Sequence, residues 1–171
     1  IMLLTSTKDP LGRVTSYTYD SRGNLSSLKD PLGNITSLSM DASGQLTAFT
    51  DPLGGSYRFA YTAGLPTRTT DQLGNITDTT YYAAGRVKTE TRHLKVADGS
   101  QIPAKTEYFC DVSGRLIRTI RPDGGEEITE YNEKGQVAAR ISNGRRTSYE
   151  YDGLGQLWKT INPMVHMRRP S

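Results

Sequence analysis

The chain has 171 residues, a formal net charge of +3 at neutral pH and one cysteine. A single cysteine excludes an internal disulfide and a four-cysteine metal site, and no apolar run approaches the roughly 18 residues of a membrane-spanning helix. Apolar residues are fewer than in an ordinary globular domain, whereas Thr, Ser, Gly and Tyr are abundant. This composition favours a sheet whose faces are partly exposed to solvent over a domain with a thick apolar core.

The positive charge lies mainly in the second half of the chain. Basic side chains alternate there with acidic ones, which include Glu107, Glu126, Glu127, Glu130 and Glu133. A nucleic-acid binder would need a stripe of one sign for the phosphate backbone, and the sequence has none. We therefore expect no nucleic-acid partner.

The first complete repeat unit runs from Asp9 to Leu25 and holds two turn signals and two short strands. Asp9–Gly12 places Pro10 where a turn needs its fixed φ and a glycine at the last position, and Tyr19–Gly23 ends in a second turn glycine. Between the turns, side chains alternate between the two faces of an extended chain. The stretch predicts a β-hairpin module that contains no catalytic residue.

The same signals recur along the chain. The glycines that close the tyrosine-containing turns are spaced 21, 20, 21, 29, 21 and 20 residues apart. These glycines are Gly23, Gly44, Gly64, Gly85, Gly114, Gly135 and Gly155. A regular period in this range predicts a repeat array. No helical pattern with capping residues is present, so the predicted fold class is all-β, a ribbon of hairpins.

The copies of Tyr19-Asp20 vary in an informative way. They become Met40-Asp41, Cys110-Asp111 and Tyr131-Asn132, so that the first place stays bulky while the acid is exchanged. A catalytic carboxylate would not be exchanged so freely, whereas a group that caps a turn can be replaced by another. We expect these aspartates to cap turns.

The strands predict two unlike faces. Thr36, Leu38 and Met40 share one face with the corresponding residues of other repeats, such as Tyr57 and Phe59, and make it apolar and aromatic. The residues between them are small and polar. The residues expected to build the repeat turns are Asp9, Pro10, Gly12, Tyr19, Asp20, Gly23, Asp30, Gly33, Gly44, Asp51, Gly54, Tyr61, Gly74, Gly85, Gly114, Tyr131, Gly135, Tyr151, Asp152 and Gly155.

The wide spacing between Gly85 and Gly114 indicates an insertion of about eight residues near 89–104, which we expect to form a longer hairpin or loop. Residues 1–163 then form one array of about seven repeats, and residues 164–171 form a tail outside the repeat pattern. About fourteen strands in one open sheet must coil, because twisted sheets rarely exceed about ten strands without curling. The unpaired strands at both ends favour further repeats as partners.

Few residues are candidates for chemistry. Cys110 replaces a repeat tyrosine and is expected to be a packed thiol, and His93 and His166 are expected to be surface residues because no ligand lies at a suitable spacing. The pairs at Asp98, Asp123 and Asn143, each followed by glycine, predict hairpin turns. We expect no cofactor, no bound metal and no enzymatic activity. Asn24–Ser26, Asn34–Thr36 and Asn75–Thr77 match the N-glycosylation pattern, which follows from the repeat chemistry itself.

The turn sequences Asp9–Gly12, Tyr19–Leu25 and Tyr151–Leu157 resemble the Rhs or YD repeats, and the resemblance covers nearly all of residues 5–163. In that family, the repeats wind as a β-ribbon spiral into a hollow shell. Such shells occur in bacterial Rhs polymorphic toxins, insecticidal toxin complexes and teneurins. The family's self-cleaving segment has no counterpart here, so neither autoproteolysis nor a toxin activity is carried over to any residue.

The resemblance implies that this chain is a segment of a shell that encloses a toxin or cargo before delivery. Its implied partners are the remaining repeats of the parent shell, the enclosed toxin or cargo and secretion-system components. Its implied location is that of a secreted or delivered bacterial effector that is made in the cytoplasm, with no signal peptide in this segment. The alternative is an extracellular adhesion or carbohydrate- and wall-binding protein, in which the aromatic ladder contacts glycans.

Overall fold

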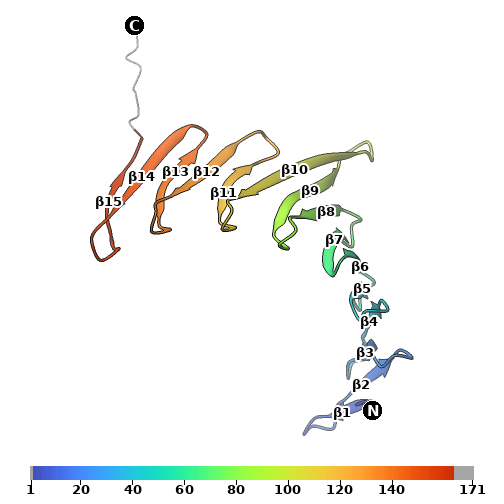
Figure 1. Cartoon of the computed structure of the whole chain (residues 1–171). Helices are drawn as coiled ribbons and strands as arrows, with labels where there is room; N and C mark the ends of the chain where they lie inside the picture. The colour runs from blue at the N-terminus through green and yellow to red at the C-terminus, as the bar shows by residue number, and fades with distance from the viewer. Residues whose placement is uncertain (1, 164–171) are drawn as a thin grey trace. The chain divides into compact units, whose positions relative to one another are not determined.

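The computed structural model describes residues 2–163, which form fifteen strands and no helix. Their order in the sheet is the order of the sequence, and successive strands pair in the antiparallel sense. Figure 1 shows the strands following one another along a single ribbon. The predicted all-β hairpin ribbon is confirmed.

The first eight strands are β1 (Ser6–Lys8), β2 (Val14–Tyr19), β3 (Leu25–Lys29), β4 (Ile35–Met40), β5 (Leu46–Thr50), β6 (Ser56–Thr62), β7 (Leu65–Thr70) and β8 (Ile76–Tyr81). The others are β9 (Val87–Lys95), β10 (Gln101–Cys110), β11 (Leu116–Ile120), β12 (Glu126–Tyr131), β13 (Val137–Ser142), β14 (Arg145–Tyr151) and β15 (Leu157–Ile161). None of the described residues belongs to a helix that could cross a membrane.

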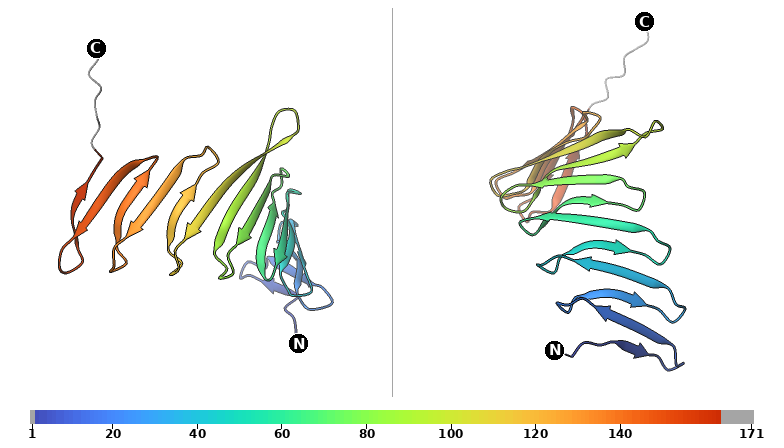
Figure 2. Two further views of the ribbon diagram at one scale, coloured as in Figure 1. Left: turned by 45° about the horizontal axis from the view of Figure 1, so that its top comes forward. Right: turned by 90° about the vertical axis from the view of Figure 1, so that its right-hand side faces the viewer.

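The chain divides into two units. One contains the residues up to Thr79 together with Arg92–Pro103, and the other contains Thr80–Thr91 together with the residues from Ala104 onward. Each unit is a single layer of strands, and no second layer covers either face (Figure 2). Among the described residues, Ala139 alone is fully buried. Each unit therefore depends on contacts between neighbouring strands and not on a central core.

The turns at both edges of the ribbon share one geometry. In the turn that begins at Asp9, Gly12 N–H donates to the Asp9 carbonyl and Asp9 N–H donates to the Arg13 carbonyl. The tyrosine-containing turn at Asp20 makes the same two bonds with Gly23 and Asn24. The two turn signals in the sequence thus encode one turn, which recurs about every ten or eleven residues.

Two connections use a shorter turn. Ala63 and Gly64 have φ of 50° and 81°, and Asn143 and Gly144 have φ of 48° and 79°. These values belong to two-residue hairpins of type I′. Asp98 and Asp123 also lie in hairpin turns, as predicted, but at the third position of the longer turn. Residues 96 and 121 begin those turns, which a reading of Asp-Gly pairs alone does not reveal.

A β-bulge lies beside each tyrosine-containing turn for which the register is given. The register shifts directly before Tyr19, Met40, Tyr61, Cys110, Tyr131 and Tyr151. A bulge increases the local twist. The backbone hydrogen bonds between adjacent hairpins end before the edge of the ribbon at which the tyrosines lie. β13 and β14, for example, pair only through Ala139–Ser142 and Arg145–Ser148. Adjacent hairpins therefore separate at the tyrosine end of the ribbon.

The two faces differ between the units. In the first unit, the face that we call the aromatic face carries Tyr17, Leu28, Thr36, Leu38, Phe49, Tyr57 and Phe59 in register. The opposite face there is rich in Ser and Thr, as predicted. In the second unit, the prediction that the opposite face is small and polar was wrong. Ile128 and Ile141 lie side by side on this face, and Arg118 lies on the other side of Ile128.

The insertion near 89–104 lengthens a hairpin. β9 and β10 have nine and ten residues, whereas the other strands have three to seven. Their connection is the common turn, in which Gly99 N–H donates to the Val96 carbonyl. The extra residues therefore extend both strands and leave the turn unchanged.

Candidate functional site: the junction between repeats

The turn aspartates bind backbone within their own turn. Asp20 Oδ1 accepts hydrogen bonds from the N–H groups of Arg22 and Asn24, both at 2.9 Å. Asp9, Asp30, Asp51 and Asp152 accept the same pair of bonds. Asn132 does so too, through its amide oxygen. Asp can therefore be exchanged for Asn in the sequence, because either side chain supplies the oxygen that the turn needs.

These bonds favour the charged form of the carboxylates. The pKa of Asp20 lies below its ordinary value, chiefly because the Asn24 side chain donates to it. The pKa of Asp30 and of Asp71 is lowered in the same way by Asn34 and Asn75. Backbone N–H of Arg115 is the main cause of the lowered pKa of Asp111. Asp20, Asp30, Asp71 and Asp111 thus act as hydrogen-bond acceptors within their turns.

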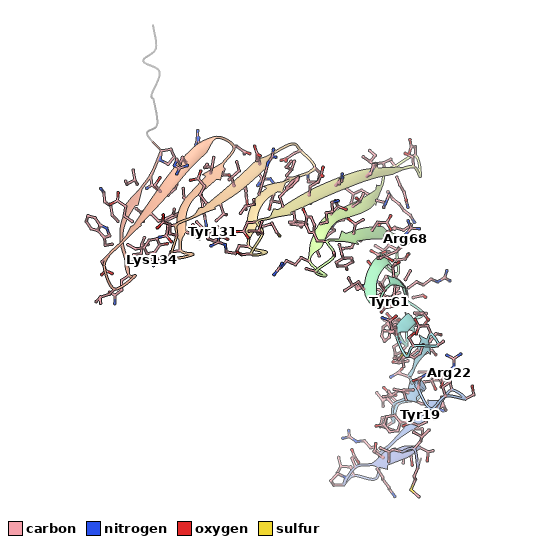
Figure 3. All side chains as sticks on the ribbon, in the orientation of Figure 1. Tyr19, Arg22, Tyr61, Arg68, Tyr131 and Lys134 are labelled. Atoms are coloured by element: carbon pink, nitrogen blue, oxygen red, sulfur yellow. The ribbon has the colours of Figure 1, made fainter. Side chains whose placement is uncertain are left out.

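The repeat tyrosines connect one hairpin to the preceding one. Tyr61 Oη donates to the carbonyl of Leu46 at 2.9 Å, Tyr131 Oη to that of Leu116 at 3.1 Å, and Tyr151 Oη to that of Val137 at 2.8 Å. Tyr19 Oη makes the equivalent bond to Leu4. Figure 3 marks Tyr19, Tyr61 and Tyr131. Each hydroxyl replaces a backbone pair where adjacent hairpins separate.

A second contact joins successive turns. Gln45 Nε2 donates to the Gly64 carbonyl at 3.2 Å, and Gln136 Nε2 donates to the Gly155 carbonyl at 3.0 Å. Arg86 occupies the same place after its turn, and its guanidinium lies where a side chain on Gly114 would stand. At these three turns, the residue after the turn glycine thus contacts the glycine of the next turn. Sequence reasoning missed this role, although these positions repeatedly hold Asn, Gln or Arg.

The remaining predicted turn residues lie in these turns. The glycines among them have φ between 77° and 91°, the region that favours glycine. They are Gly12, Gly23, Gly33, Gly44, Gly54, Gly74, Gly85, Gly114, Gly135 and Gly155. Pro10 stands at the second turn position, where the first unit repeats it in Pro31 and Pro52. Cys110 is a half-buried free thiol that takes the place of the tyrosine before its turn.

His93 has a partner that the sequence did not predict. Its Nε2 lies 2.9 Å from Asp78 Oδ2, and Arg68 binds both oxygens of that carboxylate at 2.6 and 2.9 Å. Arg68, more than His93, lowers the pKa of Asp78. The three side chains come from β7, β8 and β9 and form an ion-pair cluster. His166, the other histidine, lies outside the described residues.

Ion pairs cross the opposite face of the second unit. Arg146 in β14 binds both oxygens of Glu130 in β12 at 2.7 Å each, and the bridge spans β13 next to the buried Ala139. Arg118 pairs with Glu126, and Lys159 lies 3.6 Å from Glu150. Each of these basic groups is therefore paired with a neighbouring acid.

The hollows of the second unit are open and shallow. One hollow, of about 530 Å³, lies between the turns at Asn132 and Asp152 and is lined by Lys134, Glu150 and Trp158 among others. Lys134 is marked in Figure 3. No group of three or more His, Cys, Asp or Glu side chains suited to a metal ion occurs within residues 2–163.

Comparisons with known proteins point to one repeat family. Residues 3–35 and 41–71 match the family model described as RHS Repeat. No curated protein matches the chain. A chain in the structure of the Photorhabdus luminescens Tc holotoxin pore aligns with 86% of this chain at 20% identity and a TM-score of 0.65. That similarity extends the shared fold beyond the residues that the family model matches.

A crystal structure of TcdB2–TccC3 without its hypervariable C-terminal region aligns with 92% of this chain, at 13% identity and a TM-score of 0.45. A score this low supports no argument about fold. The aligned part is 9% of the holotoxin chain and 12% of the TcdB2–TccC3 chain. The chain therefore spans about a tenth of the length of these structures.

Proposed function

Because this chain is an Rhs/YD-repeat protein, we propose that it is a structural segment of an Rhs-type shell that encloses a toxin or cargo before delivery. The observation that carries the proposal is the junction that recurs between hairpins, in which a tyrosine hydroxyl and the residue after the turn glycine bind the adjoining repeat. Such a junction makes a continuous wall one layer thick. A wall of this kind encloses volume without needing a core of its own.

The wall has two faces that are each partly open to solvent. Strand residues on both faces are exposed or half-buried, with Ala139 as the single buried residue in the described range. Such a surface suits the lining of a water-filled cavity, because no large apolar patch has to be covered. We propose residues 1–163 as one array within this wall. The predicted tail of residues 164–171 lies outside the described residues.

We infer a non-catalytic role for the repeats. The turn acids accept hydrogen bonds within their turns, and Tyr19, Tyr61, Tyr131 and Tyr151 bind at the junctions. His93 contacts the Asp78 carboxylate, which Arg68 also binds. Hydrolysis of any substrate by the purified chain, together with loss of that activity in His93→Ala or Cys110→Ala, would contradict this inference.

The alternative is an extracellular protein that binds glycans or a cell wall through exposed aromatic side chains. Tyr61, Tyr131 and Tyr151 instead donate their hydroxyls to backbone carbonyls of the adjoining hairpin. These three repeat tyrosines thus serve contacts within the ribbon, which favours containment. In this proposal the chain belongs to a secreted or delivered effector, with the remaining repeats, the cargo and secretion-system components as its partners.

Protease protection in the parent protein tests containment. We expect a cargo segment downstream of the repeats to resist protease while the repeats are intact. Gly135→Val, which disrupts one turn, should expose the cargo to cleavage. Gly153→Val is the matched control, since Gly153 has an ordinary φ and open space around it. A cargo that is cleaved equally in all three proteins would contradict the proposal.

A further inference from the structure

One hairpin of the second unit departs from the pattern of the aromatic face. Five other hairpins pair a large apolar side chain with its neighbour across the strands: Tyr17 with Leu28, Leu38 with Phe49, Phe59 with Thr69, Tyr108 with Thr119, and Tyr149 with Thr160. The same pair in β12 and β13 is Thr129 with Arg140. This hairpin therefore has neither a ring nor a large apolar side chain at the place where the others have at least one.

An open hollow of about 450 Å³ lies over this pair, within the second unit. Its lining is apolar toward the tyrosine-containing turns and polar toward the other edge of the ribbon. Leu116, Tyr131 and Val137 lie at the apolar end, Thr129 and Arg140 in the middle, and Glu127 and Ser142 at the polar end. Because threonine is much smaller than the tyrosine of β10 or β14, the hollow has room for one planar side chain.

Arg140 is a cation without a partner within residues 2–163. Its side chain is exposed, and no acid of the described chain pairs with it. By contrast, Arg118, Arg146 and Lys159 on the opposite face each pair with an acid. Glu127, the acid that lines the same hollow, is bound by Arg121. The Arg140 guanidinium is therefore available for a carboxylate from outside the chain, which its planar set of donors matches.

We propose that this hollow binds a polypeptide segment in which an aromatic residue stands next to an acidic one. The ring lies over Thr129 against the apolar end of the hollow, and the carboxylate accepts hydrogen bonds from Arg140. The inference rests on the proposed function, because in the shell this segment belongs to the enclosed cargo. It requires the face that carries Thr129 and Arg140 to line the cavity.

A polypeptide fits the hollow better than an acidic sugar, which presents the same carboxylate. A sugar ring carries hydroxyl groups that need hydrogen-bond partners when they leave water. Leu116 and Val137 offer no polar side chain at the apolar end, and the Tyr131 hydroxyl already donates to the Leu116 carbonyl. An aromatic ring has no such requirement, so charge at Arg140 and shape at Thr129 together favour the aromatic and acidic pair.

An NMR titration of the chain with a capped peptide whose central pair is Phe-Glu tests the proposal. Two control peptides carry Phe-Gln or Ala-Glu in its place, so that each lacks one of the two groups. We expect the Phe-Glu peptide to shift the signals of Thr129 and Arg140. Each control should bind about ten-fold more weakly, as for the loss of a hydrogen bond to a charged group or of a buried ring.

Variants of the chain test the two halves of the site. Arg140→Gln should weaken binding of the Phe-Glu peptide about ten-fold. Thr129→Tyr supplies the ring that Tyr149 provides in β14 and should block binding. The matched control is Arg145→Gln, which removes the same charge at the first residue of β14, outside the lining of the hollow, and should leave binding unchanged. Circular dichroism checks that each variant folds.

Equal affinity for the Phe-Glu and Phe-Gln peptides, an equal loss in Arg140→Gln and Arg145→Gln, or the absence of binding would overturn the proposal. So would an oligosaccharide of uronic acids that binds at Thr129 and Arg140 more tightly than the peptide. A shell structure with this face on the outside would exclude the cargo as the occupant. All these outcomes leave protection of the cargo in the parent protein intact, so they are distinguishable from a failure of the proposed function.

Discussion

At the scale of single residues, each of these turns depends on two residues, one that supplies a capping oxygen and a glycine. The cap accepts two backbone N–H groups across the turn, as Asp20 does for Arg22 and Asn24. The glycine supplies the left-handed φ and leaves room for a side chain from the preceding repeat, as Gly114 does for Arg86. The cap can therefore be exchanged for Asn, whereas the glycine cannot be exchanged without strain.

Gly135→Val should disrupt its turn. The position has φ of 80°, and an added Cβ would lie 3.4 Å from Arg115 Nη1, so the substitution should cost about 1–3 kcal/mol. We expect protease cleavage near Glu133 and Lys134, with aggregation through the exposed edge. Limited proteolysis followed by mass spectrometry measures the cleavage. Protease resistance and solubility equal to those of the unmodified chain would show that the hairpin register is wrong.

Ala63 is the one alanine with a positive φ among the described residues, at 50°. An L-residue pays about 1–2 kcal/mol in this region, and Asn tolerates it better. Ala63→Asn should therefore stabilise the chain by about 0.5–1 kcal/mol and raise its urea midpoint. The matched control is Ala42→Asn, at a turn position with ordinary φ, where we expect no gain. A gain of equal size at both positions would argue against backbone strain at Ala63.

The turn acids should make the chain sensitive to acid. The pKa values of Asp20, Asp30, Asp71 and Asp111 are lowered in the folded state, so their stabilisation is complete above the ordinary value near pH 4. It is lost as the pH falls through the lowered values. Thermal midpoints measured from pH 7 to pH 2 should stay level at first and then fall.

Exchange of acid and amide tests this cause. Asp30→Asn keeps the capping oxygen and removes one titrating group, so the fall at low pH should become smaller. The reciprocal variant, Asn132→Asp, adds a titrating group to an equivalent turn and should make the fall larger. Identical pH profiles for both variants and the unmodified chain would exclude the turn caps as the source of acid sensitivity.

At the scale of elements, the hydroxyl of the repeat tyrosine connects hairpins that separate beyond the bulge. Met40 occupies the tyrosine position in its repeat but has no hydroxyl, so the junction to the preceding hairpin lacks this bond. The chain therefore contains both forms of the junction, which makes the contribution of the hydroxyl measurable in either direction.

Met40→Tyr should stabilise the chain, and Tyr131→Phe should destabilise it, each by about 0.5–1.5 kcal/mol. Met40→Phe is the control for the first change, because it supplies the ring without the hydroxyl. Chemical denaturation measures the three variants against the unmodified chain. If Met40→Phe gained as much as Met40→Tyr, packing of the ring and not the carbonyl bond would explain the effect.

The elements also show what a sequence of this kind can predict. The all-β class and the capping role of the aspartates follow from residues close together in the chain, such as Asp20 to Asn24, because turn chemistry is local. The contacts of Tyr61 with Leu46 and of His93 with Asp78 cross between strands. They depend on bulges and on the exact register of neighbouring hairpins, neither of which a single sequence encodes visibly.

The opposite face of the second unit shows the same limit. The first repeats contain Ser and Thr at these positions, and that pattern does not continue through Arg118, Ile128 and Ile141. The bridge from Arg146 to Glu130 spans a strand, so its two ends are sixteen residues apart in the sequence. Periodicity identifies the face of each residue but not its partner two strands away.

At the scale of the whole molecule, the two units share one architecture. Each unit is a single layer that buries little, and each hairpin contacts only its neighbours. Stability in such an array is a sum of repeat and junction contributions, so damage at one turn should stay local. A single layer without a core of its own is consistent with the proposed containment.

The most direct test of containment is cryo-electron microscopy of the full-length parent protein. We predict a hollow particle in which these repeats form part of the wall, with density for the cargo inside the cavity. A compact solid particle without a cavity, or an open ribbon with no enclosed volume, would contradict the account.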